Sequence, residues 1–323
     1  MRWFVGAAEL RRIGILGMNS RNIDFISRYN PRKLYPLVDD KLKTKYLAQR
    51  HHIPVPGLCF VVREQYRVNK IDRQLEELPE FAIKPAKGSG GKGILVVSGR
   101  DRESFIKTSG AVLGLRDVKR HMSNILAGLY SLAGTPDAVI VEELIHPDDL
   151  FDGYSYEGVP DIRIIVFQGY PVMAMLRLAT RESDGKANLH QGAVGVGLDI
   201  ASGRCLQAVQ HSTLIDAHPD TARIFQDICI PNWPDMLNLA SRCHDITGLG
   251  YIGADIVLDK HRGPLLLELN ARPGLSIQMA NGCGLLPRLR RIETLARRHR
   301  TARERVGYAI EIFGEASLLP KTA

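Results

Sequence analysis

GADIVLDKHRGPLLLELNARPG, residues 253–274, restricts the fold of this chain more than any other stretch. Two apolar runs flank the turn residues 261–263, which is typical of a β-hairpin. Side chains alternate along a strand, so Glu268 and Asn270 share one face, and Asp255 on the partner strand can reach it. Polar groups in such an apolar strand pair are costly unless they bind something. The hairpin therefore predicts a Mg²⁺ site with hard oxygen ligands, although local hydrogen bonds could also satisfy these groups.

Working outward from the hairpin, short apolar runs and helical patterns alternate along the chain. We predict strands at 13–17, 81–85, 93–99 and 137–145, and a hairpin over 161–181 that turns at 168–171. We predict helices at 19–30, at 39–53 with Asp39 or Asp40 as cap, at 102–134 with glycine interruptions, and at 235–248. This order indicates an α+β fold in which helices back the sheets.

A glycine-rich loop, KPAKGSGGKGI at 84–94, matches several nucleotide-binding patterns. Dinucleotide and Walker A loops must lead into a helix, whereas this loop leads into the apolar run 94–97, which reads as a strand. A protein kinase has a similar flap, but its lysine follows the flap, and the kinase catalytic motifs are missing here. The loop therefore predicts a β-hairpin flap over phosphates, with Lys84 before it and Lys92 at its tip. A solvated surface hairpin is the alternative.

Donor groups also gather in the loop DGKANLHQGA, residues 184–193. Lys186 and Asn188 lie in it, while Arg163 and Arg177 lie on the preceding strands. Guanidinium groups bind phosphate and carboxylate oxygens in pairs, so this region predicts an anionic substrate or transition state.

The net charge of +8 is concentrated near the C-terminus, where residues 285–305 hold eight arginines and two glutamates. Apolar residues recur there at helical spacing, which predicts a basic amphipathic helix over 285–312. Its outer face is either simply solvated or a docking surface for an acidic partner. We do not expect nucleic acid, because no aromatic residues interleave with the arginines.

Composition sets the remaining limits on the class of protein. No apolar run is long enough to span a membrane, and the N-terminus is too short and too polar for a signal peptide. The five cysteines are scattered, which argues against a disulfide framework or zinc site and favours a reducing, cytoplasmic setting.

The order of these motifs resembles the ATP-grasp superfamily, and within it RimK-type α-L-glutamate ligases. The similarity runs from about 39 to 290 and depends mainly on NLHQGA, GADI and LELNARPG. It implies two α+β lobes that clasp ATP, with a flap lobe at about 79–141 and a metal-binding lobe at about 142–290, inside an ATP-grasp domain at 39–320. Residues 1–38 would be a reduced N-terminal segment, shorter than the family's usual N-terminal domain, and completion by a partner is an open alternative.

The resemblance also implies which residues bind ATP. Lys84 would contact the α- and β-phosphates, and Asp161 would lie near the ribose. Lys186 and Asn188 would lie at the phosphates. The flap residues over the phosphates would be Gly88, Ser89, Gly90, Gly91 and Lys92, and the hinge beside adenine would be Glu142, Glu143 and Leu144.

Metal and substrate roles follow from the same resemblance. Asp255, Glu268 and Asn270 would hold Mg²⁺, as two ions, with Mn²⁺ as a substitute. Arg163 and Arg272, with Lys186, would be catalytic and would steady an acyl phosphate or a substrate carboxylate. Arg272 stands where RimK-type ligases tend to have a small residue, and segment 101–136 is longer than usual, so the acid substrate can differ from glutamate.

Three functions are consistent with this sequence. The first is an ADP-forming ligase that joins a small-molecule or peptide carboxylate to an amine or amino acid through an acyl phosphate. The second is a phosphotransferase acting on a small-molecule or sugar-linked acceptor, because ATP-grasp folds host both activities. The third is a nucleotide-gated binding module that uses the basic C-terminal helix.

Overall fold

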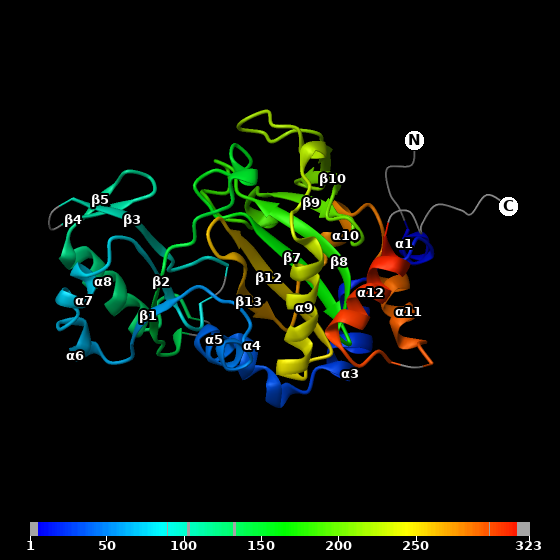
Figure 1. Ribbon diagram of the computed structural model, residues 1–323, viewed down its shortest axis with the longest axis horizontal. Helices are drawn as coiled ribbons and strands as arrows, with labels where there is room; N and C mark the ends of the chain where they lie inside the picture. Colours follow the sequence, from blue (N-terminus) through cyan, green and yellow to red (C-terminus); the bar gives the residue numbers. More distant parts are fainter. Residues whose placement is uncertain (1–5, 89, 102–103, 132–133, 297, 315–323) are drawn as a thin grey trace. The chain divides into compact units, whose positions relative to one another are not determined.

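The computed structural model describes residues 6–314 except 89, 102–103, 132–133 and 297. Contacts divide the chain into two units, which we describe separately. The smaller unit comprises Asp40–Tyr46 and Val55–His146, and the larger unit comprises Met1–Asp39, Leu47–Pro54 and Pro147–Ala323. Each unit contains one antiparallel sheet with helices packed on it, so the α+β prediction is confirmed (Figure 1).

The smaller unit is built on a sheet with strand order β1-β6-β2-β3-β4-β5. Its strands are β1 (Leu58–Val62), β2 (Phe81–Pro85), β3 (Leu95–Asp101), β4 (Ser104–Lys107), β5 (Val112–Leu113) and β6 (Val139–Glu142). Its helices are α6 (Gln65–Val68), α7 (Asp72–Glu76) and α8 (Leu115–Leu126), and the start of α5 (Lys41–Arg50) also belongs to it. Phe81, Val97 and Val141 of the sheet pack with Met122 and Ile125 of α8 in its core.

Several local predictions for this unit are confirmed. The carboxylate of Asp40 accepts hydrogen bonds from the backbone N–H groups of Leu42 and Lys43, at 3.0 and 3.2 Å, and so caps α5. Strands β2 and β3 pair antiparallel on either side of the glycine loop, as a flap requires. Residues 79–141, where we predict a flap lobe, are part of this unit, which also includes residues 55–78; the lobe itself stays a prediction.

The helix predicted over 102–134 is largely wrong. Its first part forms the strands β4 and β5, and only Leu115–Leu126 is helical. Phe105 is buried edge-to-face against Phe81, with ring centroids 5.7 Å apart, so packing on the sheet outweighs helix propensity. Helix α8 begins after Gly114, whose backbone N–H donates to the carboxylate of Asp117 at 3.1 Å.

The larger unit is built on a sheet with strand order β11-β10-β9-β8-β7-β12-β13. Its strands are β7 (Asp161–Phe167), β8 (Tyr170–Leu178), β9 (Val194–Leu198), β10 (Cys205–Gln210), β11 (Thr213–Ile215), β12 (Tyr251–Asp259) and β13 (Gly263–Asn270). Both predicted hairpins are present, and the first turns at Gln168 and Gly169. Helix α9 (Trp233–Thr247) lies across β7, β8, β12 and β13 and ends at Gly248, as predicted (Figure 1).

The remaining helical segments of the larger unit come from its two ends and three loops. They are α1 (Ala7–Arg12), α2 (Met18–Ser20), η1 (Arg21–Ile26), α3 (Ser27–Tyr29), η2 (Arg32–Leu34), α4 (Pro36–Asp39), η4 (Asp149–Phe151), η5 (Leu189–Gln191), η6 (Phe225–Asp227), α10 (Ile277–Ala280), α11 (Leu286–Glu293) and α12 (Ala302–Phe313). The helix predicted at 19–30 is confirmed as α2, η1 and α3, and Phe25 from it packs edge-to-face on Phe167 of the sheet.

The strand predicted at 13–17 is wrong. Leu16 donates its backbone N–H to the side chain of Gln278 at 2.8 Å and accepts from the same amide at 3.1 Å. A single side chain thus satisfies both backbone groups that a strand would pair with a neighbour. Only Gly14 and Leu16 of this run are buried, and the run forms an irregular segment.

The basic C-terminal helix predicted over 285–312 is also corrected, because the structure has two helices there. Helix α11 ends at Glu293, and α12 begins after Thr301, whose side chain and that of Glu304 form a reciprocal capping box. Arg288 and Arg305 are buried, so they do not belong to an outer basic face. Within the described part of the chain, no helix is long and apolar enough to cross a membrane.

Candidate functional site

A row of charged side chains crosses four neighbouring strands of the larger unit. Arg177 on β8 lies opposite Asp161 on β7, and Arg163 on β7 lies opposite Asp255 on β12. Asp255 lies in turn opposite Glu268 on β13. Residues directly opposite in an antiparallel sheet project to the same face, so these five side chains share one face.

A β-bulge determines the last member of this row. The pairing shifts between Asp255, which lies opposite Glu268, and Ile256, which lies opposite Leu266. Leu267 is the extra residue of the bulge. Without it, regular pairing would put Leu267 opposite Asp255, so the bulge exchanges an apolar neighbour for a carboxylate.

Hydrogen bonds join the two arginines to two of the carboxylates. Arg163 donates from Nε and Nη2 to Asp255 Oδ1 and Oδ2, at 2.8 and 2.6 Å. Arg177 donates from Nη2 to the same Oδ2 at 2.7 Å and from Nε to Asp161 Oδ1 at 2.5 Å. Asp255 has 0% of its surface exposed, so these guanidinium groups replace the water that would otherwise surround its charge.

Burial and charge move the pKa values of this row in opposite directions. Burial raises the pKa of Asp161 to about 6, and the nearby charge of Asp255 adds to that rise although Arg177 opposes it. Burial also acts to raise the pKa of Asp255, but Arg163 and Arg177 outweigh it and hold that pKa well below its usual range. Asp255 therefore stays ionised at neutral pH and keeps both arginines in place.

The residues predicted to hold Mg²⁺ meet on this face. Glu268 and Asn270 are half-buried on β13, two residues apart, and Glu268 lies opposite Asp255. The row has three carboxylates and two guanidinium groups, so its excess negative charge suits a divalent cation. The carboxylate of Glu268 and the amide oxygen of Asn270 are hard donors of the kind that Mg²⁺ prefers, whereas both oxygens of Asp255 accept from arginines. Among the described residues, no group of three or more His, Cys, Asp or Glu could hold a metal ion, so the Mg²⁺ site stays a prediction.

Three other predicted residues lie near loops of the larger unit. Arg272 is exposed, with its guanidinium 5.4 Å from the ring centre of Tyr35, and its backbone N–H donates to Asn270 Oδ1 at 2.8 Å. Lys186 pairs with Asp184 at 2.9 Å, and the Asn188 side chain caps η5. The structure thus connects Arg272 to the predicted metal ligands and gives Lys186 and Asn188 contacts within their own loop.

In the smaller unit, Lys84 and Glu142 form a buried ionic group with a residue that the sequence analysis missed. Glu142 Oε2 on β6 lies 2.5 Å from Nζ of Lys84 on β2, and its Oε1 lies 2.7 Å from Nζ of Lys45 on α5. Burial acts to raise the pKa of Glu142, but the two ammonium groups outweigh it and lower that pKa, whereas burial lowers the pKa of Lys45. The sequence could have predicted the burial of Lys45. It lies three residues from both Leu42 and Ala48, so helical spacing places it on the buried face of its helix.

The predicted hinge consists of Glu142 and the two residues that follow it. The backbone N–H of Glu143 donates to the carbonyl of Gly57 at 2.9 Å, and its side chain lies against that glycine. A Cβ atom at residue 57 would come within 2.3 Å of the Glu143 carboxyl carbon, so the Glu143 side chain would have to move if residue 57 had a side chain. Leu144 is half-buried.

The flap tip is exposed at Gly90, Gly91 and Lys92. Gly90 and Gly91 have positive φ angles of 63° and 74°, which explains why glycines occupy these positions. Gly88 is buried near the start of the loop that follows β2, and Ser89 lies outside the described residues.

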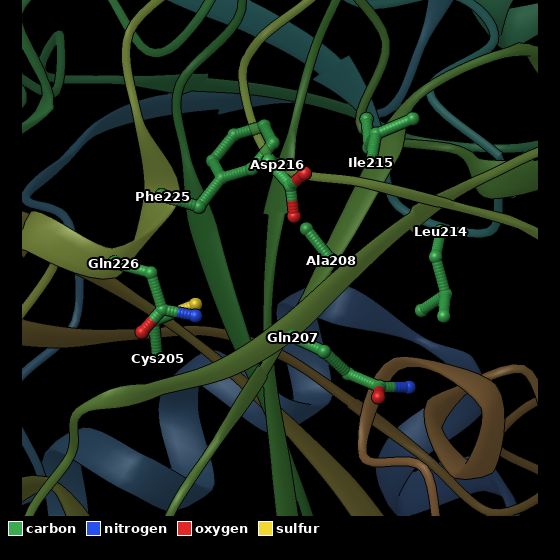
Figure 2. Close-up of a pocket in the computed structure, with 8 residues that line it drawn as sticks. All are labelled: Cys205, Gln207, Ala208, Leu214, Ile215, Asp216, Phe225 and Gln226. Atoms are coloured by element: carbon green, nitrogen blue, oxygen red, sulfur yellow. The ribbon is translucent and has the colours of Figure 1, made fainter.

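A cavity of about 100 Å³ lies elsewhere in the larger unit, beside β10, β11 and η6 (Figure 2). It is lined by Cys205, Gln207, Ala208, Leu214, Ile215, Asp216, Phe225 and Gln226. The predicted site residues are not among these, and the cavity is too small for a nucleotide.

Comparison with known proteins adds family evidence to this geometry. Residues 20–294 match the family model described as sugar-transfer associated ATP-grasp. A probable alpha-L-glutamate ligase of Maridesulfovibrio salexigens is 24% identical over 84% of this chain, and one of Thioalkalivibrio sulfidiphilus is 27% identical over 92%. The chain spans 65% of the length of the first of these relatives and 75% of the second.

Among solved structures, the chain is similar to D-cycloserine synthetase DcsG, with a TM-score of 0.46 and 14% identity over 87% of this chain and 73% of that one. It is also similar to D-alanyl-alanine synthetase A of Vibrio cholerae, with a TM-score of 0.46 and 10% identity over 87% of this chain and 66% of that one.

Proposed function

This chain belongs to the sugar-transfer associated ATP-grasp family, and on that premise we propose that it is an ATP- and Mg²⁺-dependent carboxylate–amine ligase. A substrate carboxylate attacks the γ-phosphate of ATP, which gives an acyl phosphate and ADP. An amine then attacks the acyl carbon, phosphate leaves, and an amide forms. The observation that carries the proposal is the charged row centred on Asp255, beside Glu268 and Asn270.

The row supplies what phosphoryl transfer requires, which is positioned charge rather than a protein nucleophile. Asp255 holds Arg163 and Arg177 through hydrogen bonds of 2.6 to 2.8 Å in a dry environment, so their guanidinium groups need little rearrangement when negative charge develops. Asp255, Glu268 and Asn270 would hold Mg²⁺, or Mn²⁺ in its place. When bound, the ion neutralises phosphate charge. Arg163 and Arg272 would bind the acyl phosphate or the substrate carboxylate.

The remaining residues would bind ATP. We assign Lys84 to the α- and β-phosphates, Asp161 to the neighbourhood of the ribose, and Lys186 and Asn188 to the phosphates. The flap from Gly88 to Lys92 would contribute backbone N–H groups, and the hinge from Glu142 to Leu144 would contact adenine. Support comes from the pairing of Lys84 with Glu142, because this carboxylate fixes the ammonium group at the base of the flap strand.

The substrates are proposed from the names of the relatives and the family description. Two relatives are called probable alpha-L-glutamate ligases, and the family is described as sugar-transfer associated. We therefore expect glutamate or another amino acid to be joined to a small molecule, a peptide or a sugar-linked acid or amine.

The test is a ligase screen with the full chain, ATP, Mg²⁺ and pairs of acids and amines that include amino acids, uronic acids and amino sugars. We expect equal release of ADP and phosphate that depends on both substrates, with an amide product detected by mass. Release of AMP and pyrophosphate would contradict the acyl-phosphate mechanism.

The family description also favours a second candidate, a phosphotransferase acting on a sugar hydroxyl. In that case ATP turnover would need the acceptor but no amine, and phosphate would appear in the product rather than in solution. The amine dependence of turnover therefore separates the two functions.

A further inference from the structure

The two ends of the glycine flap are held by one segment of the smaller unit, residues 121–138. At the first end, the backbone N–H of Lys87 donates to both oxygens of Asp137, at 3.1 and 3.0 Å. The hydroxyl of Ser131 donates to the same carboxylate at 2.7 Å, and residues 88 and 131 form an isolated β-bridge. The first end of the flap, its first limb at Lys87 and Gly88, is therefore fixed by backbone and carboxylate contacts.

At the second end, two side chains hold Gly93. Nε2 of His121, on α8, lies 3.0 Å from the carbonyl oxygen of Gly93, so this nitrogen carries the proton and donates it. Burial lowers the pKa of His121, which keeps the ring neutral near pH 7. The ring of Tyr130 lies against the same glycine and 5.5 Å from the His121 ring, measured between centroids.

The Tyr130 ring can lie this close only because residue 93 is glycine. Its φ angle is +77°, and a Cβ atom there would come within 2.5 Å of the Tyr130 ring. By contrast, Gly90 at the tip has nothing within 4 Å of the place where a Cβ atom would be. The end of the flap is therefore packed while its tip lies in open space.

We propose that His121 and Tyr130 are positioning residues that fix the second limb of the flap, so that the tip presents its backbone N–H groups to ATP phosphates. The inference rests on the proposed nucleotide-binding function. It also gives a purpose to the segment between flap and hinge, which the sequence analysis found longer than usual. Holding Gly93 reduces the conformational freedom that the flap must lose when it closes over phosphates.

The experiment compares variants that remove each contact with variants that keep it. His121→Phe keeps an aromatic ring but loses the donor, whereas His121→Gln keeps a donor near the position of Nε2. Tyr130→Ala removes the ring, whereas Tyr130→Phe keeps it. Tyr66→Ala is the matched control, because Tyr66 is an exposed tyrosine on α6 of the same unit.

Two measurements on the full chain test the proposal: the affinity for the non-hydrolysable analogue AMPPNP with Mg²⁺, and amide hydrogen exchange over residues 90–95. For His121→Phe and Tyr130→Ala we expect AMPPNP to bind about five- to tenfold more weakly and flap exchange to quicken about tenfold. His121→Gln, Tyr130→Phe and Tyr66→Ala should stay within about twofold of the unmodified chain.

Unchanged affinity and exchange in His121→Phe and Tyr130→Ala would overturn the proposal. Equal losses in His121→Phe and His121→Gln would also overturn it, because the donor would then not matter. Failure of the ligase screen is a separate result, since AMPPNP affinity needs no turnover. If AMPPNP does not bind to the unmodified chain, both the proposed positioning role of His121 and Tyr130 and the proposed function are wrong.

Discussion

Arg163 on β7 donates to both carboxylate oxygens of Asp255 on the adjacent strand β12, at 2.8 and 2.6 Å. The two residues are direct cross-strand neighbours, and Asp255 is fully buried. Asp255 also accepts from Arg177, so one carboxylate holds two guanidinium groups. Asp255 therefore organises the cationic part of the site in addition to its predicted role as a metal ligand.

The first prediction concerns the stability of this pair. Arg163→Met keeps most of the side-chain volume but leaves Asp255 Oδ1 buried without its donor. We expect the free energy of unfolding to fall by about 3 to 5 kcal/mol, because an uncompensated buried charge is costly. Urea unfolding at pH 7, in buffer without divalent ions, measures the change.

The control is Arg120→Ala, which breaks an exposed ion pair with Asp117. It should cost no more than about 0.5 kcal/mol. The double variant Arg163→Met with Asp255→Leu removes both charges and should recover part of the loss. Equal stability of the Arg163→Met and Arg120→Ala variants would show that the buried pair does not matter in this way.

The second prediction concerns Glu268 and Asn270, which are half-buried beside Asp255. We expect Glu268→Gln and Asn270→Ala to lower turnover by about 100-fold, with a higher Mg²⁺ concentration needed for half-maximal rate, because the first removes a negative charge and the second an oxygen donor. Both should retain the unfolding midpoint of the unmodified chain within a few degrees. Steady-state kinetics across a Mg²⁺ titration, with EDTA defining zero Mg²⁺, measures both the turnover and the Mg²⁺ concentration for half-maximal rate.

Glu311→Gln is the matched control, because this carboxylate is exposed on α12 of the same unit. Its kinetics should be unchanged. Full activity in Glu268→Gln and Asn270→Ala would remove these two residues from the metal site.

The third prediction is a pH dependence in the smaller unit. Burial acts to raise the pKa of Glu142, but Lys84 and Lys45 outweigh it and lower that pKa in the folded state. The unfolded chain therefore binds a proton more readily than the folded one. This contribution to stability is present above the unfolded pKa, about 4.3, and is lost as the pH falls through the lower folded value.

Glu142→Gln removes the charge, so it should cost about 3 kcal/mol at pH 7 and progressively less below about pH 4. Hydrogen exchange in β2 and β6 reports this unit directly. Glu64→Gln, an exposed pair with Arg67, should show no such dependence. A difference between Glu142→Gln and the unmodified chain that stays constant from pH 7 to pH 3 would contradict the linkage.

Regular strand alternation and turn residues were sufficient to predict the two hairpins and the shared face of the candidate site from sequence. The apolar runs around 168–171 and 261–263 predicted both hairpins, and alternation placed Asp255, Glu268 and Asn270 on one face. The β-hairpin around the glycine loop was predicted correctly because a strand, not a helix, follows the glycines. These features are local, so short stretches of sequence contain the information.

Features set by tertiary contact were missed. The bulge at Leu267, which puts Glu268 opposite Asp255, follows from pairing between strands and leaves no mark in the alternation of β13 alone. Lys45 joins Glu142 only because α5 packs on this sheet. The strands β4 and β5 replace a predicted helix because the ring of Phe105 packs against that of Phe81. In each case a distant partner decides the local outcome.

The last prediction separates structural arginines from those available to a partner in the basic C-terminal region. Arg305 on α12 is buried, donates from Nη2 to Asp245 at 2.6 Å, and reaches the carbonyl of Gly169 in the β7–β8 turn at 3.2 Å. Arg303 on the same helix is exposed. We expect Arg305→Met to cost about 2 kcal/mol in urea unfolding, because the partly exposed Asp245 loses its ion pair and the carbonyl of Gly169 keeps only Ser241 as a donor, and Arg303→Ala to cost less than about 0.5 kcal/mol. If an acidic partner docks here, its salt-sensitive binding should weaken in Arg303→Ala, whereas equal instability of the two variants would show that Arg303 is structural as well.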